Sequence, residues 1–88
     1  MPTISMFYGI LVRMFTGMRE HPPAHVHIAY GDFMATFDIL TAERIEGSLP
    51  RRQCRLLEAW IELHRDELLA DWELAQAGET LFNIDPLK

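Results

Sequence analysis

The stretch from Glu20 to Asp38, E-H-P-P-A-H-V-H-I-A-Y-G-D-F-M-A-T-F-D, decides the fold of this chain. Within it, Gly31-Asp32 separates two runs of strand-forming residues, His25 to Tyr30 and Phe33 to Leu40, which is typical of a β-hairpin. Glycine in the first position of a two-residue turn favours type II′. The sequence therefore predicts two antiparallel strands whose register the turn fixes.

The turn length sets which residues of the hairpin face each other. The predicted pairs are Tyr30 with Phe33, Ala29 with Met34, Ile28 with Ala35, His27 with Thr36, Val26 with Phe37 and His25 with Asp38. One face of the hairpin is then wholly apolar and belongs to the core. The opposite face carries two histidines, with a carboxylate next to the first of them.

The chain before the hairpin alternates as a strand does. From Thr3 to Phe15, every second residue is apolar, which predicts one long strand with a bend or bulge at Gly9. A turn is predicted over 16–19, and Pro22-Pro23 holds the following backbone extended. The apolar residues expected on the buried face of this strand are Ile4, Met6, Tyr8, Ile10, Val12 and Met14.

After the hairpin the pattern becomes helical. A short strand is predicted at Arg44 to Glu46, and Ser48 is the expected N-cap of a helical region that runs from Arg51 to Ala77. One unbroken helix of that length would be roughly 40 Å long, too long for a domain of this size, so we expect a break at 64–66 with Asp66 as the second cap.

The end of the chain carries a stop signal and an apolar tail. Gly78 is a natural helix terminator at the position after the C-cap. The tail from Leu81 to Leu87 alternates apolar and polar residues and is expected to add an edge strand or to reach a partner.

Length and composition indicate one ordinary globular domain over residues 1–88. The chain has 88 residues, of which 49% are hydrophobic and 24% charged, so it can bury a core but has no room for a second one. The expected fold class is α+β, with a three- or four-stranded antiparallel sheet packed on one face against C-terminal helices.

The net charge and the cysteine content indicate which kinds of binding partner and which cellular compartment are expected. The formal net charge of −5 repels polyanions and therefore does not favour RNA as a partner. RNA is kept only as a possible second partner. A single cysteine forms no disulfide within the chain, which fits the reducing cytoplasm. No apolar run is long enough for a transmembrane helix, so we expect no membrane association.

The histidines are the candidate ligands of a metal ion. His25 and His27 stand two apart on one strand, which places both rings on one face, and His21 precedes them beyond the two prolines. With Asp38 these side chains make a nitrogen and oxygen set that suits a divalent metal such as zinc. A metal is therefore one possible cofactor.

His25 and Asp38 are also a candidate catalytic pair. A carboxylate beside an imidazole fixes its tautomer and supports acid–base chemistry, as in a phosphoester hydrolase in which His27 holds the phosphate or the metal. The alternative is a solvated outer face of the hairpin on which the histidines make local hydrogen bonds.

Three arginines are a candidate anion site. Arg51, Arg52 and Arg55 lie in the first turns of the predicted helix, where the helix dipole favours anions, and Arg13 and Arg19 are candidates to join them. The alternative is a solvated helix face paired with acidic residues. Cys54, among these arginines, is either a thiol of lowered pKa or a small buried apolar residue.

Acidic residues surround apolar ones in the second part of the helical region. Leu68, Leu69 and Trp72 are candidates for an interface with a basic partner, and the simpler reading places the tryptophan in the core.

Three stretches resemble one small bacterial family. These are P-T-I-S-M-F-Y-G-I (2–10), E-H-P-P-A-H-V-H-I-A-Y-G (20–31), and L-P-R-R (49–52) followed by E-A-W-I-E-L-H-R-D-E-L-L-A-D-W-E-L-A (58–75). In this order and spacing they resemble the family catalogued as domain of unknown function four-one-six-zero. The chain departs from its pattern at Ala24, where proline is usual, and at Val26, where an aromatic residue is usual.

The resemblance implies a partner rather than a named reaction. Members of this family look like compact cytoplasmic proteins encoded beside another small protein, as toxin and antitoxin pairs are. The implied function is a toxin–antitoxin-like component that binds the neighbouring protein. The alternatives are the hydrolase above and a homodimer without chemistry. His25 and His27 match the signature histidines, with His21 as a third.

Overall fold

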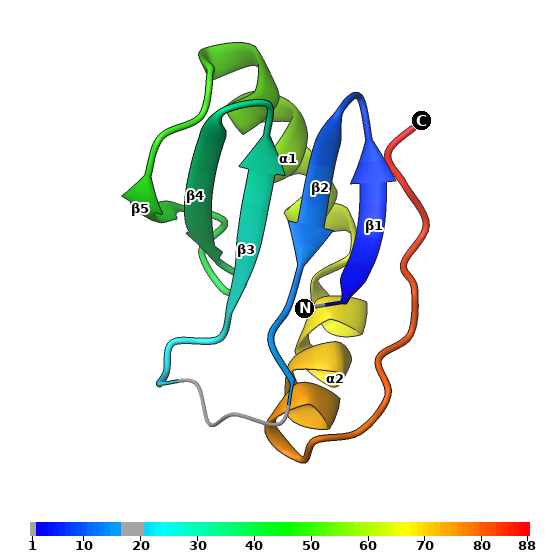
Figure 1. The fold of residues 1–88 in the computed structure, drawn as a ribbon. Coiled ribbons are helices and arrows are strands. Elements are labelled where there is room, and N and C mark those ends of the chain that lie inside the picture. The colour runs from blue at the N-terminus through cyan, green and yellow to red at the C-terminus, as the bar shows by residue number, and fades with distance from the viewer. Residues whose placement is uncertain (1, 17–20) are drawn as a thin grey trace.

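The computed structural model describes residues 2–16 and 21–88, which form one antiparallel sheet and two helices (Figure 1). Within these residues the sheet has five strands in the order β1-β2-β3-β4-β5, so each strand pairs with its neighbour in sequence. The α+β class is as predicted, with five strands in place of the expected three or four. The elements are β1 (Thr3–Phe7), β2 (Ile10–Arg13), β3 (His25–Tyr30), β4 (Phe33–Asp38), β5 (Arg44–Gly47), α1 (Arg51–Leu63) and α2 (Arg65–Gln76).

The additional strand arises because the prediction of one long strand from Thr3 to Phe15 is wrong. Tyr8 and Gly9 both have positive φ, 49° and 79°, and close a tight hairpin between β1 and β2 in which Phe7 faces Ile10. Positive φ at both central residues defines the type I′ turn, whose twist matches that of paired strands. Gly9 therefore reverses the chain instead of bending it. The turn predicted over 16–19 lies almost wholly outside the described residues.

An irregularity in β1 also changes which of its side chains are buried. The register shifts between Thr3 and Ser5, and Ser5 then shares the core side of the sheet with Val12. Met6 is consequently 64% exposed, although the alternation predicted it in the core. Tyr8, at the turn, is also exposed, whereas the expected burial of Ile4, Ile10, Val12 and Met14 is confirmed.

The central hairpin has the predicted register at every position. Strands β3 and β4 pair His25 with Asp38, His27 with Thr36 and Tyr30 with Phe33, and the three remaining predicted pairs are present as well. Gly31 has a φ of 55°, as the first position of a type II′ turn requires. The short strand predicted at 44–46 is β5, which pairs with β4 through a register shift between Thr36 and Phe37.

The helical region breaks where chain length required it to. Helix α1 ends at Leu63 and α2 begins at Arg65, with His64 between them. Both predicted caps are wrong. Pro50, not Ser48, precedes the first turn of α1, because the backbone N–H of Ser48 donates to the carbonyl oxygen of Met34 on β4. His64, not Asp66, occupies the N-cap position of α2.

The chain end is held against the sheet. Gly78 follows the C-cap of α2 with a φ of 72°, as predicted for a helix terminator. The C-terminal segment then runs beside β1 without forming a strand (Figure 1). Its fixed points are the N–H of Ile84, which donates to the carbonyl oxygen of Ile4 at 2.8 Å, and the carbonyl oxygen of Asp85, which accepts from Trp60 Nε1 at 2.8 Å.

The core lies between one face of the sheet and the helices. Trp60 of α1 is fully buried and its ring centroid lies 5.2 Å from that of Phe7. Val26, Ile28 and Phe37 contribute the apolar face of the central hairpin, as predicted. Figure 1 shows both helices on the same side of the sheet, so the other face of the sheet carries no helix in the described part of the chain.

Candidate functional site

His25 opens β3 and its ring is fixed by a local hydrogen bond. Its Nδ1 lies 2.7 Å from the carbonyl oxygen of Pro23. Because a carbonyl oxygen only accepts, Nδ1 carries the proton in this contact, and the neutral ring then has its lone pair at Nε2. The rigid proline segment thus sets both the orientation and the tautomer of His25, a role predicted for Asp38.

Four rings form a continuous series through His25. The centroid of His27 lies 4.4 Å from that of Phe15 and 5.1 Å from that of His25, and His25 lies 4.9 Å from Trp72. Figure 1 shows that helix α2 extends past the end of the sheet. Trp72 on this helix contacts His25 at the start of β3. His25 is only 9% exposed. The two signature histidines therefore join the segment after β2, strand β3 and helix α2 by ring packing.

Asp38 faces His25 in the ladder, as the turn length predicted, but its carboxylate serves the following turn. Oδ1 accepts the backbone N–H of Leu40 at 2.7 Å and that of Thr41 at 3.2 Å. Such side chain to backbone bonds stabilise a chain reversal locally. Asp38 is thus the residue that shapes the connection from β4 to β5.

The three candidate metal ligands do line one hollow. It has a volume of about 290 Å³ and lies between the loop before β3 and the outer side of β4 and β5. Within residues 2–16 and 21–88, no three His, Cys, Asp or Glu side chains are placed to hold one metal ion. The residues that line the hollow are His21, Pro22, Pro23, His25, His27, Thr36, Ile45 and Glu46.

The face of the sheet opposite the helices, hereafter the uncovered face, carries two cross-strand rows. The apolar row consists of Met6, Leu11, Ala29 and Met34, paired in that order across β1 to β4. The polar row consists of Thr3, Arg13, His27, Thr36 and Glu46, paired across all five strands. Met34 is 66% exposed, so the apolar row projects into solvent.

Comparison with family models gives a match over residues 9–73 to the family described as "Domain of unknown function (DUF4160)". The matched segment runs from the first turn through most of α2 and so contains the central hairpin, both signature histidines and the part of the uncovered face that β2 to β5 form. The chain belongs to this family. Searches of curated proteins and of solved structures returned no significant match.

The family description names no reaction, so the residues themselves carry the functional argument. Neither helix in the described part of the chain is long and apolar enough to cross a membrane.

The candidate anion site is only partly assembled. Arg51, Arg52 and Arg55 are exposed on α1, which packs on the core side of the sheet, whereas Arg13 belongs to the polar row on the uncovered face. Arg19 lies outside the described residues. The pKa of Cys54 is raised, first by burial and then by Glu58, which outweigh the lowering by Arg44. A reactive thiol of lowered pKa is therefore not what the structure contains.

The candidate interface on α2 is largely internal. Leu68 is fully buried, Trp72 is 9% exposed and packs on His25, and Leu69 is half-buried against the core. The helical spacing of these residues reflects their packing on the sheet, so the structure places them mainly in the core of this chain. An exposed apolar row lies instead on the uncovered face, where Met6 and Met34 project into solvent.

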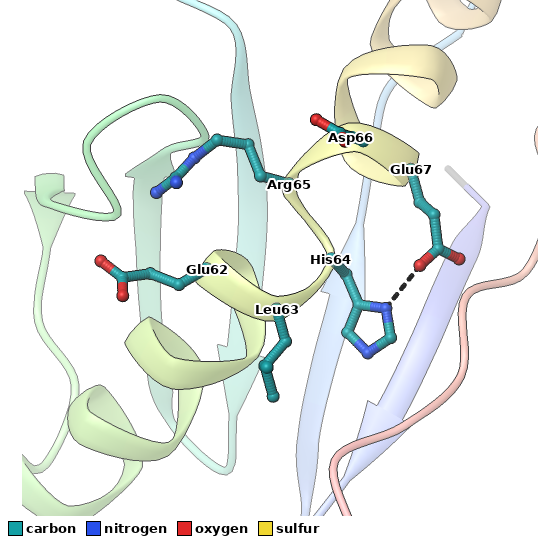
Figure 2. Close-up of a pocket in the computed structure, with 6 residues that line it drawn as sticks. All are labelled: Glu62, Leu63, His64, Arg65, Asp66 and Glu67. Carbon is teal, nitrogen blue, oxygen red and sulfur yellow. Dashed lines mark hydrogen bonds and ion pairs between the residues drawn. The ribbon is translucent and has the colours of Figure 1, made fainter.

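A second hollow, of about 320 Å³, marks the break between the helices (Figure 2). His64 packs its ring on Trp60 and lies 2.6 Å, through Nδ1, from Oε1 of Glu67. Arg65 turns the other way and donates from Nε to the carbonyl oxygen of Ile39 at 2.9 Å. These contacts fix the angle between α1 and α2, which accounts for the hollow structurally.

Asp71 is a buried carboxyl on α2 that ties down the C-terminal segment. It is 1% exposed, and its Oδ1 accepts the backbone N–H of Phe82 at 3.0 Å. Among the described residues, Oδ2 has no hydrogen-bond partner. Burial raises the pKa of Asp71, the hydrogen bond from Phe82 opposes that change, and nearby Glu67 adds to it.

The Asp71→Asn variant is expected to be more stable than the wild type at neutral pH by about 1 kcal/mol in the free energy of unfolding. It should therefore unfold at a higher temperature. The amide keeps the acceptor for Phe82 but removes a buried charge. A raised pKa in the folded state means that protonated Asp71 favours folding, a contribution that is complete below the usual pKa and is lost as pH rises through the folded value. The difference between the variants should therefore shrink on acidification, which thermal unfolding at several pH values measures.

Proposed function

We propose that this protein is the partner-binding component of a small cytoplasmic, toxin–antitoxin-like module, and that it binds its partner protein through the uncovered face. One observation carries the proposal. Met6 and Met34 are 64% and 66% exposed and stand in one cross-strand row with Leu11 and Ala29, on the side of the sheet opposite α1 and α2.

The chemistry of this row suits a protein surface. Contiguous apolar side chains rimmed by polar ones are typical of protein interaction sites, and burial of apolar area contributes roughly 25 cal/mol per Å². Methionine is flexible and polarizable, so it adapts to a partner surface. The polar row beside it supplies charged groups for orientation. The net charge of −5 supports a protein partner over RNA.

The hydrolase alternative has weaker support. His25 and Asp38 are paired in the ladder, and His21 and His27 line the same hollow. However, Asp38 Oδ1 already accepts two backbone N–H groups, and Nδ1 of His25 donates to Pro23. If the protein were a hydrolytic toxin, growth arrest on expression would be relieved by changing both signature histidines to phenylalanine, which keeps a ring at each position.

The Met34→Asp variant is expected to abolish capture of the protein encoded by the neighbouring gene. A charge in the middle of the apolar row would have to be desolvated in the complex, which we expect to weaken binding by about a hundredfold. The side chain is 66% exposed, so the fold should tolerate the change. Co-expression, affinity capture and titration calorimetry measure the loss.

A matched control is Leu63→Asp. Leu63 is 70% exposed at the end of α1, on the helix side of the molecule (Figures 1 and 2), so it tests the general effect of removing an exposed apolar residue. Capture should survive this change. Equal capture by both variants, or loss in both, would contradict the proposed surface.

A further inference from the structure

We propose that, in the absence of its partner protein, the uncovered face binds a second copy of this chain, related by a two-fold axis that runs parallel to the strands between β3 and β4. This inference rests on the proposed function for the location of the surface and adds a weak homodimer that the partner protein would displace. Two independent features of the face, one of shape and one of charge, select the same axis.

The shape argument comes from the apolar row. Exposed Met34 on β4 stands directly beside the small Ala29 on β3. Sheets that pack face to face lie roughly 10 Å apart with side chains interdigitated. An axis between β3 and β4 lays β3 of one copy over β4 of the other. Each Met34 then enters the space above Ala29 of the second copy, and the contact occurs twice.

The charge argument comes from the polar row. Arg13 on β2 and Glu46 on β5 lie at equal numbers of strands from an axis between β3 and β4. Rotation about that axis places Arg13 of each copy opposite Glu46 of the other. Both are long side chains, Glu46 on the edge strand β5 and Arg13 on β2 next to the other edge strand, so they can meet across the interface and form two reciprocal ion pairs. The same rotation places His27 opposite Thr36.

Other axes lose both features. An axis along β3 would set Ala29 against Ala29 and leave a gap, and it would place Arg13 opposite Thr36. An axis along β4 would set Met34 against Met34 and move Arg13 beyond the edge of the opposing sheet. The axis between the two strands is therefore the arrangement in which shape and charge agree.

The test is sedimentation equilibrium of charge-reversed variants over about 1 to 500 μM. A small face with rim ion pairs predicts a weak dimer, with Kd on the order of 10–100 μM. Arg13→Glu and Glu46→Arg should each weaken self-association at least tenfold, because each creates two like-charge pairs. An equimolar mixture of the two variants should form a heterodimer near wild-type strength, and the double variant should form a homodimer.

A second pair of variants tests the shape argument without changing charge. Ala29→Met should weaken the dimer because it fills the space that Met34 needs, and adding Met34→Ala should restore it. The side chain at position 29 points away from the core, so the fold should tolerate the substitution. Circular dichroism of each variant checks that the fold is kept.

Several outcomes would overturn the inference. They are a wild-type monomer throughout the concentration range, single charge variants that associate as the wild type does, or a mixture no stronger than its components. A monomeric wild type that still captures the neighbouring protein through Met34 would refute only the homodimer. A dimer with the predicted charge complementation but no capture would refute only the toxin–antitoxin-like module.

Discussion

The Gly47→Ala variant is expected to lose about 4 kcal/mol of stability, because its new methyl group has no space and its backbone conformation disfavours a side chain. A Cβ at this position would lie 2.1 Å from the carbonyl oxygen of Met34 and 2.8 Å from the Cα of Ala35. Both are backbone atoms of β4, so neither can move without disturbing the sheet. The φ of 80° adds left-handed strain.

Gly31→Ala is the matched control for Gly47→Ala. Gly31 also has a positive φ, 55°, but a Cβ there would meet nothing within 4 Å. Its cost should therefore be about 1 kcal/mol, from backbone strain alone. Urea unfolding of both variants measures the difference. Equal costs would mean that β5 is not packed closely on β4 at Gly47, which would also remove the support for the position of Glu46.

The His25→Ala variant is expected to lose about 3 kcal/mol, although the residue has the appearance of a catalytic histidine. Truncation removes the hydrogen bond to Pro23 and the ring contacts with His27 and Trp72. It also leaves a cavity at the junction of β3 and α2. Chemical unfolding at neutral pH measures the loss.

His25→Phe separates packing from proton transfer. The phenyl ring keeps the contact with Trp72 but cannot donate to Pro23, so about half of the loss should be recovered. If His25→Ala were as stable as the wild type, the ring series would not hold these elements together, and a role in chemistry would gain weight.

The central hairpin could be predicted pair by pair because a two-residue turn leaves its register no freedom. Gly31-Asp32 fixes that register, and the apolar alternation on both sides agrees with it. The break between the helices could also be predicted from the sequence, since a domain of this size cannot contain an unbroken helix from 51 to 77. In both cases one geometric constraint was sufficient.

The first hairpin could not be predicted because the residues of its turn fit the sequence pattern of a strand. Tyr8 is a strand-forming residue that adopts a left-handed conformation next to Gly9, and apolar residues continue on both sides. The irregularity between Thr3 and Ser5 is likewise invisible in the alternation, yet it decides that Met6 faces solvent. The uncovered face was missed for this reason, since half of its apolar row depends on β1 and β2.

The structure brings the histidines of the candidate site together, but it engages two of the site's polar groups in local hydrogen bonds. The sequence pattern predicted that His21, His25 and His27 lie close together, and in the structure all three line one hollow. The sequence could not reveal that the His25 ring is hydrogen-bonded to Pro23 and the Asp38 carboxylate to the turn after β4. Such hydrogen bonds depend on loop conformations.

The most direct test of the central claim compares partner capture by Met34→Asp and His25→Phe in titrations with the protein encoded by the neighbouring gene. The expectation is that Met34→Asp binds about a hundredfold more weakly than the wild type, whereas His25→Phe binds within about threefold of it. Undiminished binding by Met34→Asp together with loss in His25→Phe would contradict it, and would place the function at the histidines instead of the uncovered face.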